Sequence, residues 1–115
     1  MHNRTLNALI RKRLEVTQEE NSAITYTVNW APFLDTATVS TSTWTTEDSG
    51  LTVANKANNT TEASARFSGD PGHYRAVNQI VDSAGDTHER YLDIYIRDNT
   101  SGYQFDYGLV QAPRY

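Results

Sequence analysis

The chain has 115 residues, of which 37% are hydrophobic and 21% are charged, and its formal net charge is −4. This composition is typical of one soluble globular domain, and the sequence has no apolar run long enough to span a membrane. Cysteine is absent, which excludes disulfides, thiolate zinc sites and cysteine nucleophiles.

Residues 4–15 carry the only pattern that favours a helix. Their apolar side chains recur at steps of three, one and four residues, which places them on one stripe of a helix. The stripe consists of Leu6, Leu9, Ile10 and Leu14. Because a helix of about twelve residues is marginal alone in water, we expect it to pack on the rest of its own chain or on a neighbouring subunit.

Charge is unevenly distributed along the chain. Residues 1–14 carry a net charge of +4, whereas residues 15–115 carry −8. The basic residues of the first segment, Arg11 and Arg13 among them, suit an acidic partner surface, and we expect no nucleic acid partner. The alternative is a solvated helix face without a partner.

Segments with alternating apolar and polar residues follow, separated by turn residues at intervals of about eight to twelve. The clearest are 24–30, 38–46, 51–53, 63–67, 74–81 and 91–96. Threonine, serine and asparagine, with 15, 8 and 9 copies, suit strands and turns. We therefore predict an all-β fold, a small antiparallel β-sandwich. The predicted core consists of Tyr26, Val28, Trp44, Phe67, Ile80, Leu92, Ile94 and Ile96.

The segment 38–46 has one irregularity. Val39 and Trp44 would lie on opposite faces of a regular strand, so we expect a β-bulge between them.

The segment 70–76 sharpens this prediction. Its sequence, Asp-Pro-Gly-His-Tyr-Arg-Ala, resembles the D-x-G-x-Y-x-C motif that enters strand F of immunoglobulin domains. Tyr74 matches the corner tyrosine, Ala76 stands in the position of the disulfide cysteine, and Trp44 in that of the core tryptophan. The resemblance implies an immunoglobulin-like sandwich. The alternative is an ordinary turn followed by a strand tyrosine.

Three longer stretches resemble a group of small virion proteins of tailed bacteriophages, the fibre–tail adaptor proteins. The stretches are Ile24–Trp30, then Val39–Thr45 with Gly50–Val53, and then Tyr74–Val81 with Ala84–Thr87. They match an extended strand that ends in Trp, a Ser/Thr ladder followed by Gly-Leu-Thr-Val, and a Tyr-x-x-x-Asn strand that leads into an Ala-Gly hairpin. The resemblance covers residues 23–97 and includes neither the basic N-terminus nor the C-terminal tail.

The last segment, residues 99–115, has a different character. Its large side chains are interleaved with glycine and proline, and a tail this rich in aromatic residues normally docks on a protein surface. We predict an arm (1–20), a sandwich (21–98) and a docking tail (99–115). The predicted partner contacts are Leu6, Leu9, Ile10, Arg11, Arg13, Leu14, Tyr103, Phe105, Tyr107 and Tyr115. The alternative is that both arms close the ends of their own sandwich.

No motif for catalysis or cofactor binding is present in the sequence. Asp82, Asp86 and Glu89 surround one predicted hairpin and could hold calcium, but these are also ordinary turn residues. His2, His73 and His88 have no spacing typical of metal ligands. We therefore expect no catalytic residues, no metal and no cofactor.

The resemblance implies a non-enzymatic structural protein, an adaptor that joins the tail or connector of a virion to fibres or to neighbouring tail proteins. The expected partners are other virion proteins and copies of the chain itself, with no membrane. The expected location is the virion, after synthesis in the host cytoplasm. The alternatives are a capsid decoration protein and a carbohydrate or cell-surface binding module, for which Tyr91 and Tyr95 on one strand face would be the aromatic contacts.

Overall fold

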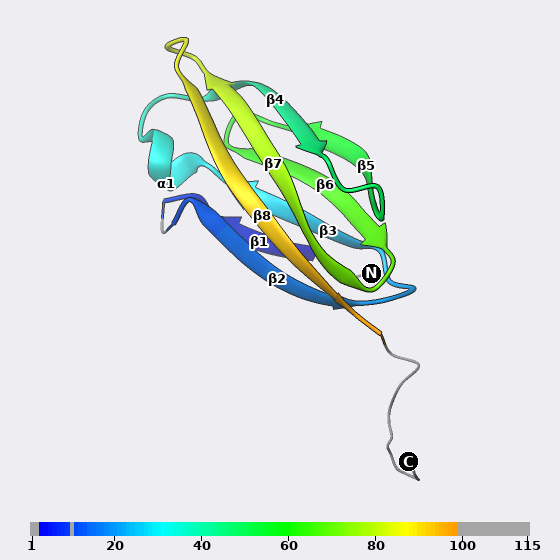
Figure 1. Ribbon diagram of the computed structural model, residues 1–115. Coiled ribbons are helices and arrows are strands. Elements are labelled where there is room, and N and C mark those ends of the chain that lie inside the picture. Colours follow the sequence, from blue (N-terminus) through cyan, green and yellow to red (C-terminus); the bar gives the residue numbers. More distant parts are fainter. Residues whose placement is uncertain (1–2, 10, 99–115) are drawn as a thin grey trace, which may run out of the picture.

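The computed structural model describes residues 3–9 and 11–98. Within them, eight strands form two four-stranded sheets that pack face to face (Figure 1). The first sheet has the order β1-β3-β6-β5, from β1 (Asn3–Asn7), β3 (Ile24–Asn29), β6 (Glu62–Gly69) and β5 (Leu51–Asn58). The second has the order β2-β8-β7-β4, from β2 (Arg13–Glu19), β8 (Thr87–Arg97), β7 (Gly72–Asp82) and β4 (Val39–Thr46). The predicted β-sandwich is thus confirmed, but the prediction of antiparallel pairing is wrong for β1 and β2, each of which pairs in parallel with its neighbour.

The chain begins in one sheet and crosses to the other. β1 pairs in parallel with β3, and β2 pairs in parallel with β8, whereas the other neighbouring strands are antiparallel. Residues 8–9 and 11–12 lie in the crossover between β1 and β2. Arg90 on β8 fixes this crossover, because its Nε donates to the Ala8 carbonyl oxygen at 2.7 Å.

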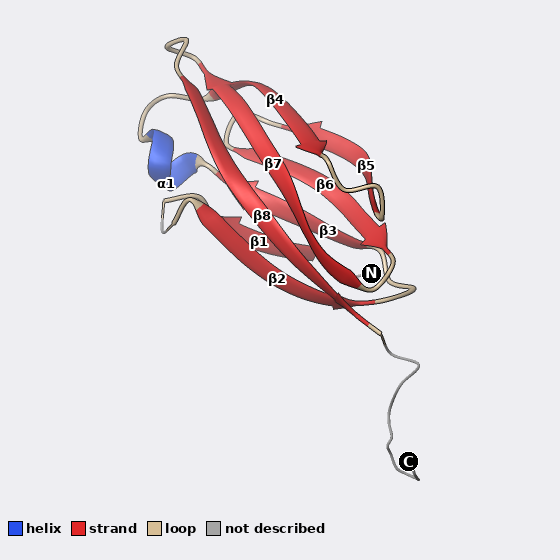
Figure 2. Cartoon of the chain, viewed as in Figure 1, coloured by secondary structure: helices blue, strands red, loops and turns tan. Residues whose placement is uncertain are grey.

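The predicted N-terminal helix is wrong, since residues 3–7 and 13–19 form β1 and β2. The apolar residues that suggested one helical stripe lie on two short strands instead. Leu6 is on β1, Leu14 is on β2, and Leu9 is in the crossover between them. Within β2, exposed and buried residues alternate strictly, and Leu14, Val16 and Gln18 are the buried ones. The described part of the predicted arm is therefore built into both sheets. The single helical turn of the described chain is α1 (Ala31–Leu34), between β3 and β4 (Figure 2).

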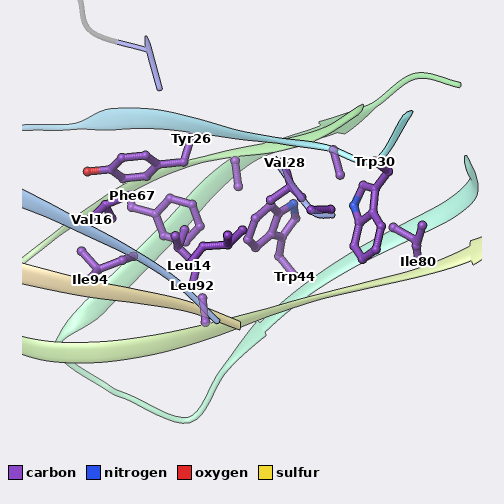
Figure 3. Close-up of a cluster of buried hydrophobic side chains, with 14 of the residues drawn as sticks. Leu14, Val16, Tyr26, Val28, Trp30, Trp44, Phe67, Ile80, Leu92 and Ile94 are labelled. Carbon is purple, nitrogen blue, oxygen red and sulfur yellow. The ribbon is translucent and has the colours of Figure 1, made fainter. Parts of the chain in front are cut away.

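All eight residues of the predicted core are buried, at 4% exposure or less. Figure 3 shows the aromatic rings in a row between the two sheets, with Tyr26 and Phe67 at one end and Trp30 at the other. The Trp44 ring meets the Phe67 ring edge to face, with the centroids 5.3 Å apart. Trp30 is also fully buried, as its place in the alternating segment 24–30 would allow, although the predicted core did not include it.

Two buried amides connect the sheets through hydrogen bonds. Asn78 on β7 accepts from Trp30 Nε1 at 2.9 Å and donates to Ser42 Oγ and the Thr43 carbonyl oxygen on β4. Near the other end of the core, Tyr26 donates its hydroxyl hydrogen to Gln18 Oε1 at 2.9 Å. These partners satisfy polar groups that would otherwise destabilise the core.

The tyrosine corner is confirmed. Tyr74 Oη donates to the Asp70 carbonyl oxygen at 2.8 Å, which ties the start of β7 to the turn before it. A Cβ at Gly50 would lie 2.7 Å from Tyr74 Oη, so only glycine lets the β4–β5 turn approach this ring.

The predicted bulge in β4 is also confirmed, because the pairing of β4 with β7 shifts between Val39 and Thr41. This shift lets both Val39 and Trp44 face the core. β5 is longer than predicted and continues to Asn58 through an irregularity between Ala54 and Ala57.

Candidate partner-binding surface

The structure separates the residues that the sequence predicted as partner contacts. Leu14 is buried in the core, and Leu6 is half-buried against it. Leu9 is 57% exposed in the crossover, and Arg11 and Arg13 are exposed nearby. The remaining predicted contacts, Ile10, Tyr103, Phe105, Tyr107 and Tyr115, lie outside the described residues.

A cluster of charged and aromatic side chains covers the outer face of the second sheet. Its centre is Asp93 on β8, whose side chain is only 2% exposed although it lies on the face opposite the core. Arg75 on β7 donates to both carboxylate oxygens, from Nε at 2.8 Å and from Nη2 at 3.3 Å. Arg13 Nε lies 3.5 Å and His73 Nε2 lies 4.0 Å from Asp93 Oδ2. One carboxylate thus fixes three side chains from two neighbouring strands.

Strand register explains why these side chains meet. Arg75 pairs with Asp93, and His73 pairs with Tyr95, in the ladder between β7 and β8. Arg13 pairs with Tyr91 on the other side of β8. Side chains opposite each other on one sheet face are close enough to interact, so the alternation of β8 brings this cluster together.

Aromatic contacts order the rest of the cluster. The Arg75 guanidinium lies 5.0 Å and Lys12 Nζ lies 5.6 Å from the centroid of the Tyr91 ring. Tyr95 is 39% exposed and stacks on His73 with the ring centroids 4.3 Å apart. We call this surface the basic–aromatic patch, and it consists of Lys12, Arg13, His73, Arg75, Tyr91 and Tyr95.

The patch carries permanent positive charge. The hydrogen bond to Asp93, reinforced by the charge of that carboxylate, raises the pKa of Arg75 above its usual value. Lys12, Arg13 and Arg75 together face Asp93 and the nearby Glu15, which lies 3.9 Å from Arg13 Nε. A third acidic side chain adjoins the patch, because Asp48 Oδ2 accepts from the Arg75 backbone N–H at 2.9 Å.

A second cluster lies at the other end of β8, beside α1. The Arg90 guanidinium lies 4.5 Å from the Phe33 ring centroid and 5.1 Å from that of Trp30. Burial lowers the pKa of Arg90. The His88 ring meets Phe33 edge to face at 4.9 Å, and its Nε2 lies 2.9 Å from Asp82 Oδ2. These contacts hold α1 and the crossover against β8.

Two hollows open along the side of the sandwich where β1 and β2 are the edge strands. The larger, about 400 Å³, is lined by residues that include Ile24, Tyr26 and Arg4. The smaller, about 280 Å³, is lined by residues that include Leu6 and Arg11. The smaller hollow therefore brings together three of the residues that the sequence predicted as partner contacts, Leu6, Arg11 and Leu14.

Two of the three calcium candidates, Asp82 and Glu89, have protein partners for their carboxylates. Asp82 Oδ1 accepts from the backbone N–H groups of Ala84 and Asp86 at 2.9 and 3.0 Å, so this side chain shapes the β7–β8 hairpin. Glu89 accepts from Gln79 Nε2 at 3.0 Å. Among the residues that the structure describes, no three metal-ligating side chains gather into a site.

Sequence reasoning placed Tyr91 and Tyr95 on one face of their strand but missed the residues between and beside them. Asp93 looked like an ordinary exposed residue of an alternating strand. The sequence does carry a signal for this cluster, but it is spread over two strands. In one strand Asp93 stands two residues from a tyrosine on either side, and in the preceding strand His73 and Arg75 stand two residues apart. Recognising it requires the register of β7 against β8, which the sequence alone did not provide.

Comparison with protein families gives one match. The model of the family described as podophage GP4 fiber-tail adaptor protein gp77 matches residues 18–95. A search of curated proteins found no significant match. In the described part of the chain, no helix is long and apolar enough to cross a membrane.

Solved structures resemble this fold at low sequence identity. The cysteine protease inhibitor EhICP2 from Entamoeba histolytica has a TM-score of 0.52 and 8% identity, over 84% of this chain and 96% of that one. The PKD domain from KIAA 1837 protein has a TM-score of 0.50 and 12% identity, over 89% of this chain and 86% of that one. At such identities the likeness shows the sandwich fold alone.

Proposed function

This chain belongs to the podophage GP4 fibre–tail adaptor family, and we propose that it joins the tail or connector of a virion to fibres or to neighbouring tail proteins. The observation that carries the proposal is the family match over residues 18–95, from β2 into β8. The family is a structural one, so the proposed role is non-enzymatic. The proposed location is the tail or head–tail region of the virion.

The architecture supports a role as a rigid spacer. Two sheets share one continuous core, and the amides of Asn78 and Gln18 fix the sheets relative to each other. A close-packed interior of this kind deforms little under load. An adaptor needs this property, because it must hold its two partners at a fixed distance.

The proposed partner contacts lie outside the core. Leu9, Arg11 and Arg13 are exposed at the crossover and the start of β2, and Leu6 and Arg11 line the smaller hollow. Leu14 is left out because its side chain is buried. To these we add, as proposals from the sequence, Ile10 and the tail residues Tyr103, Phe105, Tyr107 and Tyr115. The partners are other virion proteins and further copies of this chain.

A carbohydrate-binding role has less support. Sugar rings stack on exposed aromatic faces, but Lys12 and Arg75 lie over the Tyr91 ring. The Tyr95 ring is stacked on His73. The two tyrosines that would form a sugar platform are therefore engaged with protein side chains.

The proposal is tested with phage particles assembled without this protein. An adaptor role predicts filled heads with tails that lack fibres, visible by negative-stain electron microscopy. Adding the purified protein to these particles should restore fibre attachment and infectivity. Particles that keep their fibres but lose capsid stability would instead identify a capsid decoration protein.

A further inference from the structure

One side of the sandwich is open between the two sheets. The edge strands β4 and β5 lie against each other along one side, whereas β1 and β2 make few contacts with each other along the opposite side (Figure 1). Both hollows described above lie along this second side, which we call the open seam. Apolar side chains from three strands contribute to its lining, and two of them, Leu6 and Ile24, are only half-buried there.

The seam also offers backbone hydrogen-bonding groups. In the described chain, β2 has a strand partner on one side only, and that partner is β8. The Lys12 carbonyl oxygen and the Glu20 N–H each bond toward β8 at 2.9 Å. Backbone groups of successive residues point to alternate sides of a strand, so those of Arg13, Glu15 and Thr17 point away from β8, toward the seam. An edge of this kind can be extended by a further strand.

The C-terminal tail has the sequence pattern of such a strand. Between residues 103 and 109, large apolar side chains alternate with small or polar residues. The apolar residues are Tyr103, Phe105, Tyr107 and Leu109. A period of two places all four on one face of a strand. The segment has seven residues, as β2 does, so it is long enough to cover the whole edge of β2 with its apolar face over the seam.

The tail begins at one end of the seam. Arg97 of β8 pairs with Glu19, and Glu19 lines the larger hollow. Within one copy, residues 99–102 would have to reverse the chain and pass the β2–β3 turn, which is bonded to the end of β8 through the Glu20 N–H. A short hinge that folds back only under strain favours exchange of the segment between copies.

From these observations we infer that residues 103–109 of one copy add as a strand to the β2 edge of a neighbouring copy. Main-chain hydrogen bonds to that edge give affinity, and the apolar side chains that enter the seam give specificity. Each copy donates one tail and receives one, so the contact closes as a dimer or repeats as a ring. The inference rests on the proposed function, in which tail residues and copies of this chain take part in the contacts, and it names the surface that the tail binds.

The first test is sedimentation velocity on the purified full-length protein over a range of concentrations. We expect the wild type to associate. Phe105→Ser/Tyr107→Ser should weaken the association more than about tenfold, because buried aromatic side chains dominate contacts of this kind. The matched control, Gln104→Ser/Asp106→Ser, changes the other face of the same segment and should associate like the wild type.

A backbone variant tests the receiving edge. Thr17→Pro removes an N–H group that points toward the seam, and proline is tolerated at such positions of an edge strand, so the sandwich should still unfold cooperatively in urea. Its association should fall as in the apolar-face variant of the tail. Thr17→Ala keeps the N–H group and should associate like the wild type.

Single-cysteine variants separate exchange between copies from closure within one copy, because the chain has no cysteine of its own. In a mixture of Thr17→Cys and Gln104→Cys, a short bismaleimide should produce dimers that contain one chain of each variant. Lys56→Cys lies on β5, the edge strand on the opposite side of its sheet, and should give no such dimer with Gln104→Cys.

Three results would each overturn the inference. They are a wild type that is monomeric at every concentration, equal association of the two tail variants, and cross-links that form only within single chains of the double variant Thr17→Cys/Gln104→Cys. Because no virion takes part in these measurements, each of these results would leave the adaptor proposal standing.

Discussion

Two tryptophans lie in the same core but have different polar surroundings. Trp30 Nε1 donates to Asn78 Oδ1 at 2.9 Å, whereas Trp44 Nε1 has no acceptor among the described residues. Changing Trp30 to Phe removes that donor and leaves a buried amide oxygen unsatisfied, which costs about 1–3 kcal/mol. We predict that Trp30→Phe lowers the free energy of unfolding in urea by that much more than Trp44→Phe does. Equal losses would contradict this account of the Asn78 network.

The size of Trp44 matters independently of its polar atom. The side chain is 4% exposed and lies against Phe67, so its truncation leaves a large cavity. Trp44→Ala should lower the free energy of unfolding by about 3–5 kcal/mol. A loss below about 1 kcal/mol in the same urea experiment would remove Trp44 from the core.

Asp82 gives the fold a predictable response to acid. The hydrogen bond to His88, followed by that from the Asp86 backbone N–H, holds the pKa of Asp82 below its ordinary value. A carboxyl group with a lowered pKa in the folded state stabilises the protein above its unfolded pKa, about 4. That stability is lost as the pH falls through the folded pKa.

The matching experiment follows thermal unfolding of wild type and Asp82→Asn between neutral and strongly acidic pH. The variant should be less stable than the wild type near neutrality, and the difference should shrink below about pH 4. A difference that stays constant down to strongly acidic pH would show that the pKa of Asp82 is not lowered by folding.

Residues on the core face of a strand could be predicted from the sequence, and polar residues with unusual partners could not. Alternation alone identified Tyr26, Phe67 and Ile94 as buried. Asp93 follows the same alternation and was assigned to solvent, yet it is covered by Arg75 and Arg13 from neighbouring strands. Burial of a charge depends on which residues lie opposite it, and the order of strands in the sheet decides that.

At the scale of elements, the first two strands show how a helix can be predicted wrongly. Residues 4–15 contain apolar side chains at helical spacing, but the chain turns between residues 8 and 12, so the spacing spans two strands. Parallel pairing of β1 with β3 and of β2 with β8 supplies long-range partners that override a local pattern. The twelve residues 4–15 contain neither β3 nor β8, so their local pattern cannot reveal these two pairings.

This placement changes the expected effect of truncation. Removing residues 1–20 deletes β1 and β2, and with them Leu14, Val16 and the Gln18 acceptor of Tyr26. We predict that the remaining chain no longer unfolds cooperatively in urea, followed by tryptophan fluorescence. The matched control is the fragment 1–98, which keeps every strand that the structure describes and should unfold like the full chain. Cooperative unfolding without residues 1–20 would show that the two strands are dispensable.

The hairpins at the ends of the longer strands were the most predictable elements. Asp70-Pro71-Gly72 marked the corner before β7, and the Tyr74 hydroxyl bond to Asp70 closes it as expected. The bulge in β4 followed from two large apolar residues that a regular strand would place on opposite faces. Such features are encoded within a few residues, so the sequence alone is sufficient to find them.

At the scale of the whole molecule, the structure shows that the basic N-terminal segment is part of the sandwich. Arg11, Lys12 and Arg13 do not project on a separate arm, since they lie at the crossover and on β2, beside the aromatic residues of β8. The charge asymmetry along the chain is thus not one between an arm and a body, because Arg13 lies beside the same Asp93 carboxylate as Arg75. The overall sandwich was predictable from the spacing of strands and turns, whereas this arrangement of charge required the fold.

The central claim is that this protein lies between tail and fibre, and a cryo-electron microscopy map of the purified virion tests it most directly. The two-sheet sandwich has a distinctive shape, so it can be placed in density at subnanometre resolution. The account predicts density for the sandwich where the fibre bases meet the tail or connector, in contact with both. Density for the sandwich on the outer capsid surface, away from the tail, would contradict it.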